Sequence, residues 1–170
     1  STDNCGIASL TVSPSTFICA NTAQPVTVTL TATDNSGNSS TCTNLVTVQD
    51  TVKPIAICQP VTVQLDGNGQ ATVTSAQVNN GSTDNCGIAS LNVSPSTFSC
   101  ANTAQPVTVT MTATDNSGNS SICTSLVTVQ DTVKPVAICQ PVTVQLDGNG
   151  QATVNSAKVN NGSTDNCGIA

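Results

Sequence analysis

The sequence predicts an all-β fold made of tandem, disulfide-stapled β-sandwich domains, and three observations carry this prediction. The 170-residue chain is an internal repeat, in which residues 82–162 restate residues 1–81. Within each copy, apolar and polar residues alternate over short stretches, which is the pattern of strands with one buried face. Turn-forming Asp, Asn and Gly residues separate these stretches, and nine cysteines are spread among them.

The two copies of the repeat are nearly identical. They align without a gap and differ at eight positions, one of which is Leu30/Met111. The last eight residues, STDNCGIA, are also the first eight. We therefore interpret the chain as a stretch of a longer tandem array.

Each period contains six or seven short stretches that we expect to form strands. In the clearest one, four apolar residues alternate with threonines, so that each set faces one side of a sheet. So many short strands in about 80 residues predict a sandwich of the immunoglobulin type. The DGNG sequence after the first strand is typical of a type I′ hairpin turn. The expected strands in one period are residues 61–65, 70–78, 87–93, 96–100, 106–114 and 121–130.

Domain boundaries are expected at the two QDTVKP segments, because a strand ends there and proline marks a linker. Residues 1–50 are then the C-terminal part of one immunoglobulin-like repeat. Residues 51–131 are a complete repeat, and residues 132–170 are the N-terminal part of the next. Such small domains with only two aromatic residues in the whole chain need covalent support.

The composition argues against several classes of function. The net charge is −6, with nine Asp, three Lys and no Arg, so binding to nucleic acid or anionic membranes is not expected. No apolar run approaches the ~20 residues of a membrane span. His, Glu, Arg and Tyr are absent, which removes the usual general acid–base partners. We expect no enzymatic activity and no required cofactor.

The nine cysteines predict disulfides rather than zinc sites. Zinc sites pair closely spaced cysteines, as in CxxC, or add histidine. Here histidine is absent, and even the nearest cysteines, such as Cys86 and Cys100, have a whole expected strand between them. Disulfides at this density indicate an oxidising, extracellular setting, either secreted or on a cell surface.

The strand order suggests which cysteines pair. In an immunoglobulin-like sandwich the first and last strands often lie side by side in parallel, and Cys58 and Cys123 begin these two strands. Four cysteines in one domain allow three connectivities, and the sequence leaves them open. The remaining pairs would be Cys86–Cys100 and, by the same rule, Cys5–Cys19. Partners outside the 170 residues are expected for Cys42, Cys139 and Cys167.

Several motifs together resemble the hyalin-repeat (HYR) type of immunoglobulin-like domain. The motifs are TDNCG, TATDNSGNSSTC, DTVKP and AICQPVTV, and the resemblance covers the whole period. It implies long tandem arrays in secreted or surface proteins, notably bacterial ones, with adhesion or structural spacing as the role and no catalysis. The chain departs from the family pattern by an extra cysteine after Phe17 and Phe98 and by lacking a Cys-Gly near the second strand. The resemblance therefore does not decide the disulfide map.

Aspartates in three loops form a candidate metal site. We expect the STDN loop, the TDNSGN loop and the incoming linker at the same end of a domain, which would bring Asp84 and Asp115 to Asp50. Converging oxygen ligands suit Ca²⁺, and Asp-bearing linkers act by a similar logic at cadherin-type junctions. The alternative is that Asp and Asn serve only as turn formers. The full candidate set is Asp50, Asp84, Asn85, Asp115 and Asn116 at one junction, with Asp131 and Asp165 at the next.

Short motifs also indicate covalent glycans. The DTV sequence resembles an acceptor pattern for bacterial O-glycosylation, with Thr51 and Thr132 as the acceptors. A Ser/Thr-rich surface with little charge would tend to self-associate if it carried no glycans. Weaker N-linked sequons begin at Asn38, Asn80, Asn92, Asn119 and Asn161.

Together these features predict a structural protein, namely an extracellular filament, fibril or surface stalk of end-to-end repeats. Its main partner is then the same repeat, continued end to end or associated laterally. The alternative is an adhesin or carbohydrate-binding repeat module on a cell surface. A binding module should carry exposed aromatics or variable loops. Here the loops are the most constant part of the repeat, which favours the structural role.

Overall fold

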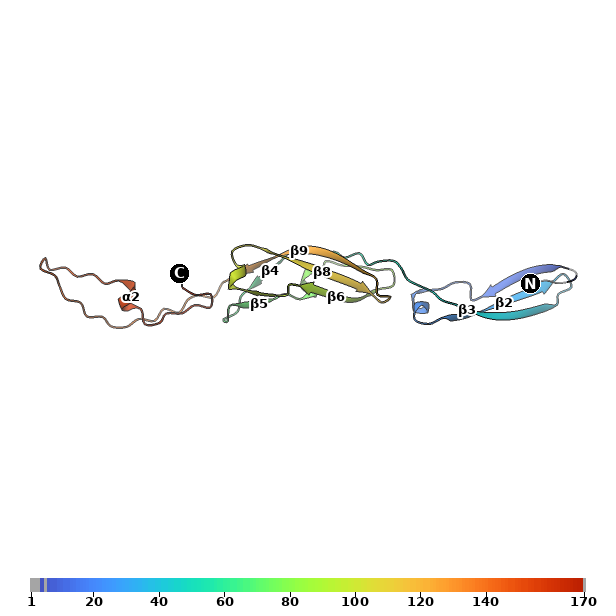
Figure 1. The fold of residues 1–170 in the computed structure, drawn as a ribbon, viewed down its shortest axis with the longest axis horizontal. Helices are drawn as coiled ribbons and strands as arrows, with labels where there is room; N and C mark the ends of the chain where they lie inside the picture. Colours follow the sequence, from blue (N-terminus) through green and yellow to red (C-terminus); the bar gives the residue numbers. More distant parts are fainter. Residues whose placement is uncertain (1–3, 5, 170) are drawn as a thin grey trace. The chain divides into compact units, whose positions relative to one another are not determined.

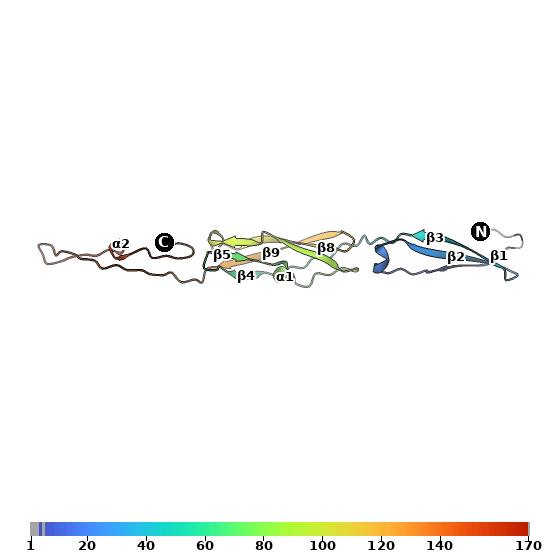
Figure 2. The same cartoon turned by 90° about the horizontal axis from the view of Figure 1, so that it is seen from below.

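The computed structural model describes residue 4 and residues 6–169, and strands make up most of its regular structure (Figures 1 and 2). The all-β prediction is confirmed at this level. The chain forms two compact units, each assembled from several segments. The first contains Ser1–Ile55, Thr83–Ser90 and Ala113–Ser121, and the second contains Ala56–Ser82, Leu91–Thr112 and Ile122–Ala170.

A three-stranded antiparallel sheet in the order β1-β2-β3 lies in the first unit. Val and Thr dominate its central strand, and their branched side chains favour extended backbone. The register places Leu30 opposite Val12 on one side and Cys42 on the other. The strands are β1 (Ile7–Ser13), β2 (Val26–Asp34) and β3 (Ser39–Val46), and a 3₁₀ helix, η1 (Cys19–Thr22), separates β1 from β2 in sequence.

Residues 61–130 form a four-stranded sheet in the order β4-β9-β8-β6 and a two-stranded antiparallel sheet, β5-β7. β4 and β9 pair in parallel, with Val61 opposite Val127, as expected for the first and last strands of a repeat. The strands are β4 (Val61–Gln64), β5 (Gln70–Thr72), β6 (Ile88–Ser94), β7 (Thr97–Ser99), β8 (Val107–Asp115) and β9 (Ser120–Gln130). The short helices are α1 (Ser75–Val78), η2 (Cys100–Asn102) and α2 (Ser156–Val159).

The buried core belongs to the second unit. Val109 and Met111 of β8 and Val127 of β9 are fully buried, whereas Thr108 is exposed. The alternation predicted along β8 is therefore confirmed. The core cluster consists of Val63, Leu65, Val73, Val78, Phe98, Val109, Met111, Val127 and Val129.

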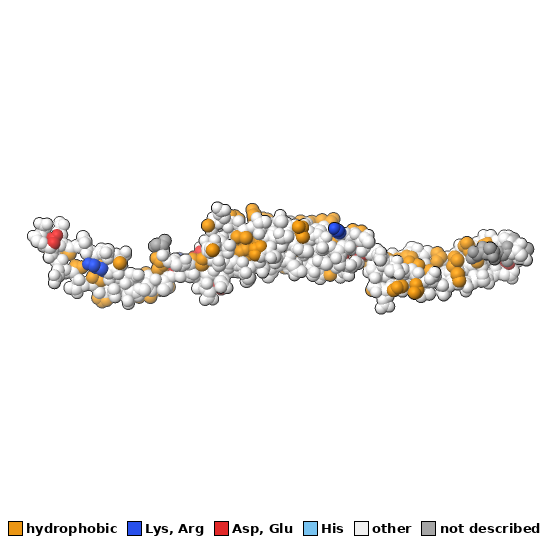
Figure 3. All heavy atoms as spheres, viewed as in Figure 1, with side chains coloured by type: hydrophobic (Ala, Val, Ile, Leu, Met, Phe, Trp, Pro, Cys, Tyr) orange, Lys and Arg blue, Asp and Glu red, His pale blue; other side chains and the backbone are white. Residues whose placement is uncertain are grey.

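The same strand sequence is buried to different degrees in the two copies. Val28 and Leu30 of β2 correspond to Val109 and Met111 of β8, yet both remain partly exposed. Residues 61–78 contribute four apolar side chains to the cluster that buries the apolar face of β8. The apolar side chains along β1–β3 lie open, as the space-filling view shows (Figure 3).

Two local predictions are wrong. Residues 70–78 do not form one strand, because a helical turn, α1, follows β5. The side-chain oxygen of Gln77 accepts hydrogen bonds from the Thr74 N–H (2.9 Å) and hydroxyl (3.0 Å), which closes the start of this turn. The DGNG sequence is not a type I′ hairpin turn, because β4 pairs with β9 and β5 with β7. Within it only Gly69 has a positive φ, 71°.

Asp66 holds this DGNG turn together. Its Oδ1 accepts hydrogen bonds from the backbone N–H groups of Asn68 (2.8 Å) and Gln70 (2.9 Å). The bonds from Gln70 and Asn68 hold the pKa of Asp66 below its usual value of 3.8. The pKa of Asp147, one period later, is lowered by the same kind of backbone hydrogen bond, chiefly from Gln151.

Replacing Val109 by Ala should lower the free energy of unfolding by about 2 kcal/mol, because buried methyl groups are lost and a cavity remains. Thr108→Ala, on the exposed face of the same strand, is the matched control and should cost less than about 1 kcal/mol. Urea unfolding followed by circular dichroism measures both changes. Equal losses for the two variants would contradict the burial of β8.

The free energy of unfolding should also fall as the pH drops below about 4. Because the folded-state pKa of Asp66 is depressed, its contribution is complete above the ordinary pKa of 3.8 and is lost as the pH falls through the folded value. Asp66→Asn should remove part of this dependence. Urea titrations between about pH 3 and pH 7 test it. A difference between variant and wild type that stays constant over this range would refute the assignment.

Candidate functional site

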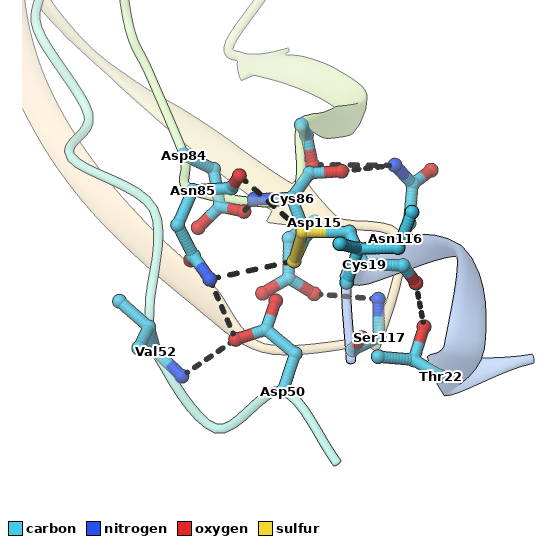
Figure 4. Close-up of a disulfide and its surroundings, with 12 residues drawn as sticks. Cys19, Thr22, Asp50, Val52, Asp84, Asn85, Cys86, Asp115, Asn116 and Ser117 are labelled. Carbon is cyan, nitrogen blue, oxygen red and sulfur yellow. Dashed lines mark hydrogen bonds between the residues drawn. A yellow bond between two sulfur atoms is a disulfide. The ribbon is translucent and has the colours of Figure 1, made fainter. Parts of the chain in front are cut away.

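Three carboxylates from distant parts of the sequence meet in the first unit. Asp50 follows β3, Asp84 lies in the loop before β6, and Asp115 is the last residue of β8. One oxygen of each lies within 4.8 Å of the other two. Figure 4 shows the carboxylates of Asp50 and Asp115 facing each other beside the disulfide of Cys19 and Cys86.

Two carboxylate oxygens in this cluster are buried without a hydrogen-bond donor. Asp50 Oδ1 accepts hydrogen bonds from Val52 N (3.1 Å) and Asn85 Nδ2 (3.3 Å). Asp84 Oδ2 accepts one from Cys86 N (2.8 Å). The other oxygens, Asp50 Oδ2 and Asp84 Oδ1, each expose less than 1 Å² and have no partner. Burying such atoms is costly unless something compensates them.

Asp115 is the most deeply buried of the three, with 2% of its surface exposed. Its Oδ1 accepts hydrogen bonds from the backbone N–H groups of Ser117 and Asn119, each at 2.8 Å. Its Oδ2 accepts one from Asn119 Nδ2, also at 2.8 Å. Burial alone would raise the pKa of Asp115, but these hydrogen bonds, led by the Asn119 amide, outweigh it and hold the pKa below its usual value. The group is therefore ionised at neutral pH.

The turn after β8 also recognises the linker that carries Asp50. Asn119 Nδ2 donates to the backbone carbonyls of Asp50 (3.0 Å) and Val52 (3.3 Å). The hydroxyl of Ser121 donates to the carbonyl of Pro54 at 2.6 Å. Since these bonds use the linker backbone, they place the Asp50 carboxylate without occupying it.

The two asparagines predicted as ligands use their amide nitrogens to position the surrounding loops. Asn85 Nδ2 donates to Asp50, and Asn116 Nδ2 donates to the carbonyls of Cys86 (2.9 Å) and Gly87 (3.4 Å). An open hollow lined in part by Asp50 and Asn116 gives solvent access beside the cluster.

Much of the arrangement recurs one period later, in the second unit. Asp131 Oδ1 accepts a hydrogen bond from Asn166 Nδ2 (3.1 Å), and Asp165 Oδ2 accepts one from Cys167 N (3.0 Å). Asp165 Oδ1 is again buried without a partner, and here Asn166 Oδ1 is as well.

The disulfides differ from the predicted map in an informative way. Cys58–Cys123 is present, as expected from the parallel first and last strands. The predicted pairs Cys86–Cys100 and Cys5–Cys19 are wrong, and so is an outside partner for Cys167. The bonds formed instead are Cys19–Cys86 and Cys100–Cys167.

The physical reason lies in the hydrogen bonds that Asn119, Ser121 and Asn85 make to the linker. These bonds bring the loop before β6 close to η1 of the preceding copy. Cys19 and Cys86 then lie with their Cα atoms 5.3 Å apart, a distance suited to a disulfide. Both bonds join cysteines 67 residues apart, so the second bond repeats the first one period later.

The remaining cysteines are exposed thiols where the structure describes them. Cys42 and Cys139 are free. They correspond to Cys123 and Cys58, which are bonded to each other, so partners in neighbouring repeats stay a prediction. Cys5 lies outside the described residues.

The predicted glycan acceptors are mostly accessible. Thr51 and Thr132 are exposed. Asn119 is unsuited, because its Nδ2 already donates to Asp115 and to the linker carbonyls. Asn38 Nδ2 likewise donates to Asp34 at 2.8 Å. The exposed sequon asparagines without such a bond are Asn80, Asn92 and Asn161.

No known protein-family model matches the chain, and no characterised protein matches it at significant similarity. Over the part of the chain that the structure describes, no helix is long and apolar enough to cross a membrane. The three disulfides indicate an oxidising, extracellular environment.

In the oxidised chain, non-reducing peptide mapping should recover Cys19 linked to Cys86 and Cys100 linked to Cys167. Replacing Cys19 and Cys86 together by Ser should lower the free energy of unfolding by up to about 4 kcal/mol, from the entropy of the loop that the bond closes. Cys139→Ser, at an exposed free thiol, should change it by less than about 0.5 kcal/mol. A linked peptide joining Cys86 to Cys100 would contradict the structure.

Proposed function

We propose that this protein is a structural component of an extracellular filament, fibril or surface stalk, built from immunoglobulin-like repeats joined end to end. One observation carries the proposal. The bonds Cys19–Cys86 and Cys100–Cys167 each link one sequence copy to the next at equivalent positions. A bond repeated in this way serves continuity of the array, and the proposed role is mechanical, with no catalysis.

For the repeat itself we propose a sandwich of the hyalin-repeat type over residues 51–131. Its support is the pair of sheets, β4-β9-β8-β6 and β5-β7, and the parallel first and last strands stapled by Cys58–Cys123. Near-identical copies would give each joint the same geometry and a constant rise. Strands of about ten residues correspond to a rise of roughly 35–45 Å per repeat.

The disulfides form a covalent route along the chain that bypasses most of each repeat. Tension entering at Cys19 crosses to Cys86, follows the backbone to Cys100, and crosses to Cys167. Within the second copy, residues 82–162, the load is therefore borne by the short segment 86–100 alone. At about 3.5 Å per residue, this segment can extend to about 50 Å.

This route limits how far the array can lengthen even after its folded structure is lost. A repeat without disulfides could extend to about 280 Å, whereas the loaded segment reaches about 50 Å, close to the expected folded rise. Unfolding would therefore release little slack. Cys58–Cys123 lies off the route and staples the fold only. A stalk or fibre that must keep its length benefits from this arrangement.

An adhesin or carbohydrate-binding role has less support. Phe98, the aromatic residue of the second copy, is 4% exposed and belongs to the core, so that copy offers no aromatic platform for a sugar. We propose that glycans are carried by the protein itself, with exposed Thr51 and Thr132 as the first acceptors.

Stretching single oxidised chains between handles at residues 1 and 170 tests the load-bearing role. The contour length at high force should be about 130 Å, because only residues 1–19, 86–100 and 167–170 lie on the route. Reduction of the disulfides should raise it to about 590 Å. This length depends on covalent connections, so it can be measured whether or not the chain is folded.

Two matched variants make the test specific. With Cys19 and Cys86 replaced by Ser, the load must pass through Cys58–Cys123, and the oxidised contour length should rise to about 300 Å. With Cys58 and Cys123 replaced by Ser, one disulfide is also lost, but the length should stay at about 130 Å. The proposal would be overturned by equal lengthening in both variants, or by a wild-type length of about 300 Å.

A further inference from the structure

We propose that Asp50, Asp84 and Asp115 together bind a calcium ion. The site would join the linker of one sequence copy to two loops of the next. It rests on the contacts within the first unit, and it holds or fails independently of whether the repeats build a fibre.

The unpaired oxygens are the observation that turn formation does not explain. Asp50 Oδ1 and Asp84 Oδ2 cap backbone N–H groups, as turn-forming aspartates do. Asp50 Oδ2 and Asp84 Oδ1 accept no hydrogen bond, although each exposes less than 1 Å² of surface. One carboxylate oxygen of each of these two residues and of Asp115 lies within 4.8 Å of the other two. A cation bound by the three carboxylates would compensate the groups that carry the orphaned oxygens.

Electrostatics point the same way. Three negative charges this close repel one another unless a positive charge compensates them. The chain has three lysines and no arginine, and Lys53, the nearest lysine in sequence to Asp50, is exposed. A cation from solution would supply the compensating charge.

The donor set selects calcium among the common metal ions. Every donor is an oxygen, and the nearby sulfur atoms of Cys19 and Cys86 are oxidised to a disulfide, so softer metals lack their ligands. Ca²⁺ accepts six to eight oxygens in flexible geometry, which suits a linker and two loops with solvent access through the adjoining hollow. Mg²⁺ keeps most of its waters and usually takes one or two carboxylates.

The recurrence one period later shows that the arrangement belongs to the repeat. Asp131 and Asp165 repeat the first two carboxylates, and Asp165 Oδ1 is again orphaned. Among the described residues, the full set of three is found at Asp50, Asp84 and Asp115. We therefore expect one high-affinity calcium ion per 170-residue chain.

Calorimetric titration of the oxidised, chelator-treated chain with CaCl₂ tests the site, together with thermal unfolding in EDTA and in calcium. The expected result is one tight site per chain and a higher unfolding temperature in calcium. Asp50→Asn should weaken binding at least about tenfold, because it removes one ligand charge. In EDTA the same variant should unfold no earlier than wild type, because a like charge has been removed. A purely structural Asp50 would instead make the variant less stable in both conditions.

The first copy of the repeat supplies a matched control. Asp34 occupies the same TATDNSGN turn as Asp115 and accepts the same backbone hydrogen bonds, from Ser36 and Asn38 at 2.8 Å. Asp34→Asn and Asp115→Asn change the turn in the same way, because each removes the oxygen that accepts from the Asn38 or Asn119 side chain. Only Asp115→Asn should lose calcium binding. Three results would overturn the proposal: no calcium response in wild type, equal calcium responses in the two variants, or tighter binding of Mg²⁺ than of Ca²⁺.

Discussion

Cys19 and Cys86 lie 67 residues apart, in different copies of the repeat, and their bond holds η1 beside the loop that precedes β6. That loop carries Asp84 and Asn85, and Asn85 donates to the linker aspartate, Asp50. The covalent joint and the acidic cluster are therefore parts of one structure. The linker is held on its other side by Asn119, so that the joint is defined by backbone contacts as well as by sulfur.

The composition of the core explains why such joints matter. The buried cluster is assembled from Val, Leu, Met and a single Phe, and it covers only the part of the chain where residues 61–78 pack on β8 and β9. Small cores of aliphatic residues provide limited stability, and covalent cross-links compensate for this. Cys58 and Cys123 pack against the core that their bond staples.

The aspartate side chains of the repeat have two distinct roles. In the DGNG and TDNSGN turns, one carboxylate satisfies several backbone N–H groups, which lowers its pKa and closes the turn. At the joint, Asp50 and Asp84 each use one oxygen in the same manner and leave the other buried and unpaired. The second use has no local explanation. It recurs at Asp165 one period later, so it marks the joints between copies. The joint that brings three carboxylates together is the candidate functional site.

Local patterns in the sequence were sufficient for most of the strands and for part of the site. Alternation identified β8, and the rule for first and last strands identified Cys58–Cys123, because both depend on periodicity within one copy. Loop order alone placed Asp50, Asp84 and Asp115 at one end of a domain, and the structure brings them together. The T-x-x-Q capping pattern at Thr74 and Gln77 was also present in the sequence, but the alternation around it indicated a strand.

The tertiary structure decided the disulfide pairing and the side-chain burial, because both depend on contacts between one copy and the next. The residues that flank Cys86 in the sequence do not indicate whether it bonds to Cys100 or to Cys19. The position of the linker selects Cys19. In the same way, Val28 and Val109 sit in strands of nearly the same sequence, yet Val109 alone is fully buried. Burial and disulfide pairing depend on distances between segments that are far apart in the chain. A repeating sequence has the same local pattern in every copy, so that pattern cannot specify these distances.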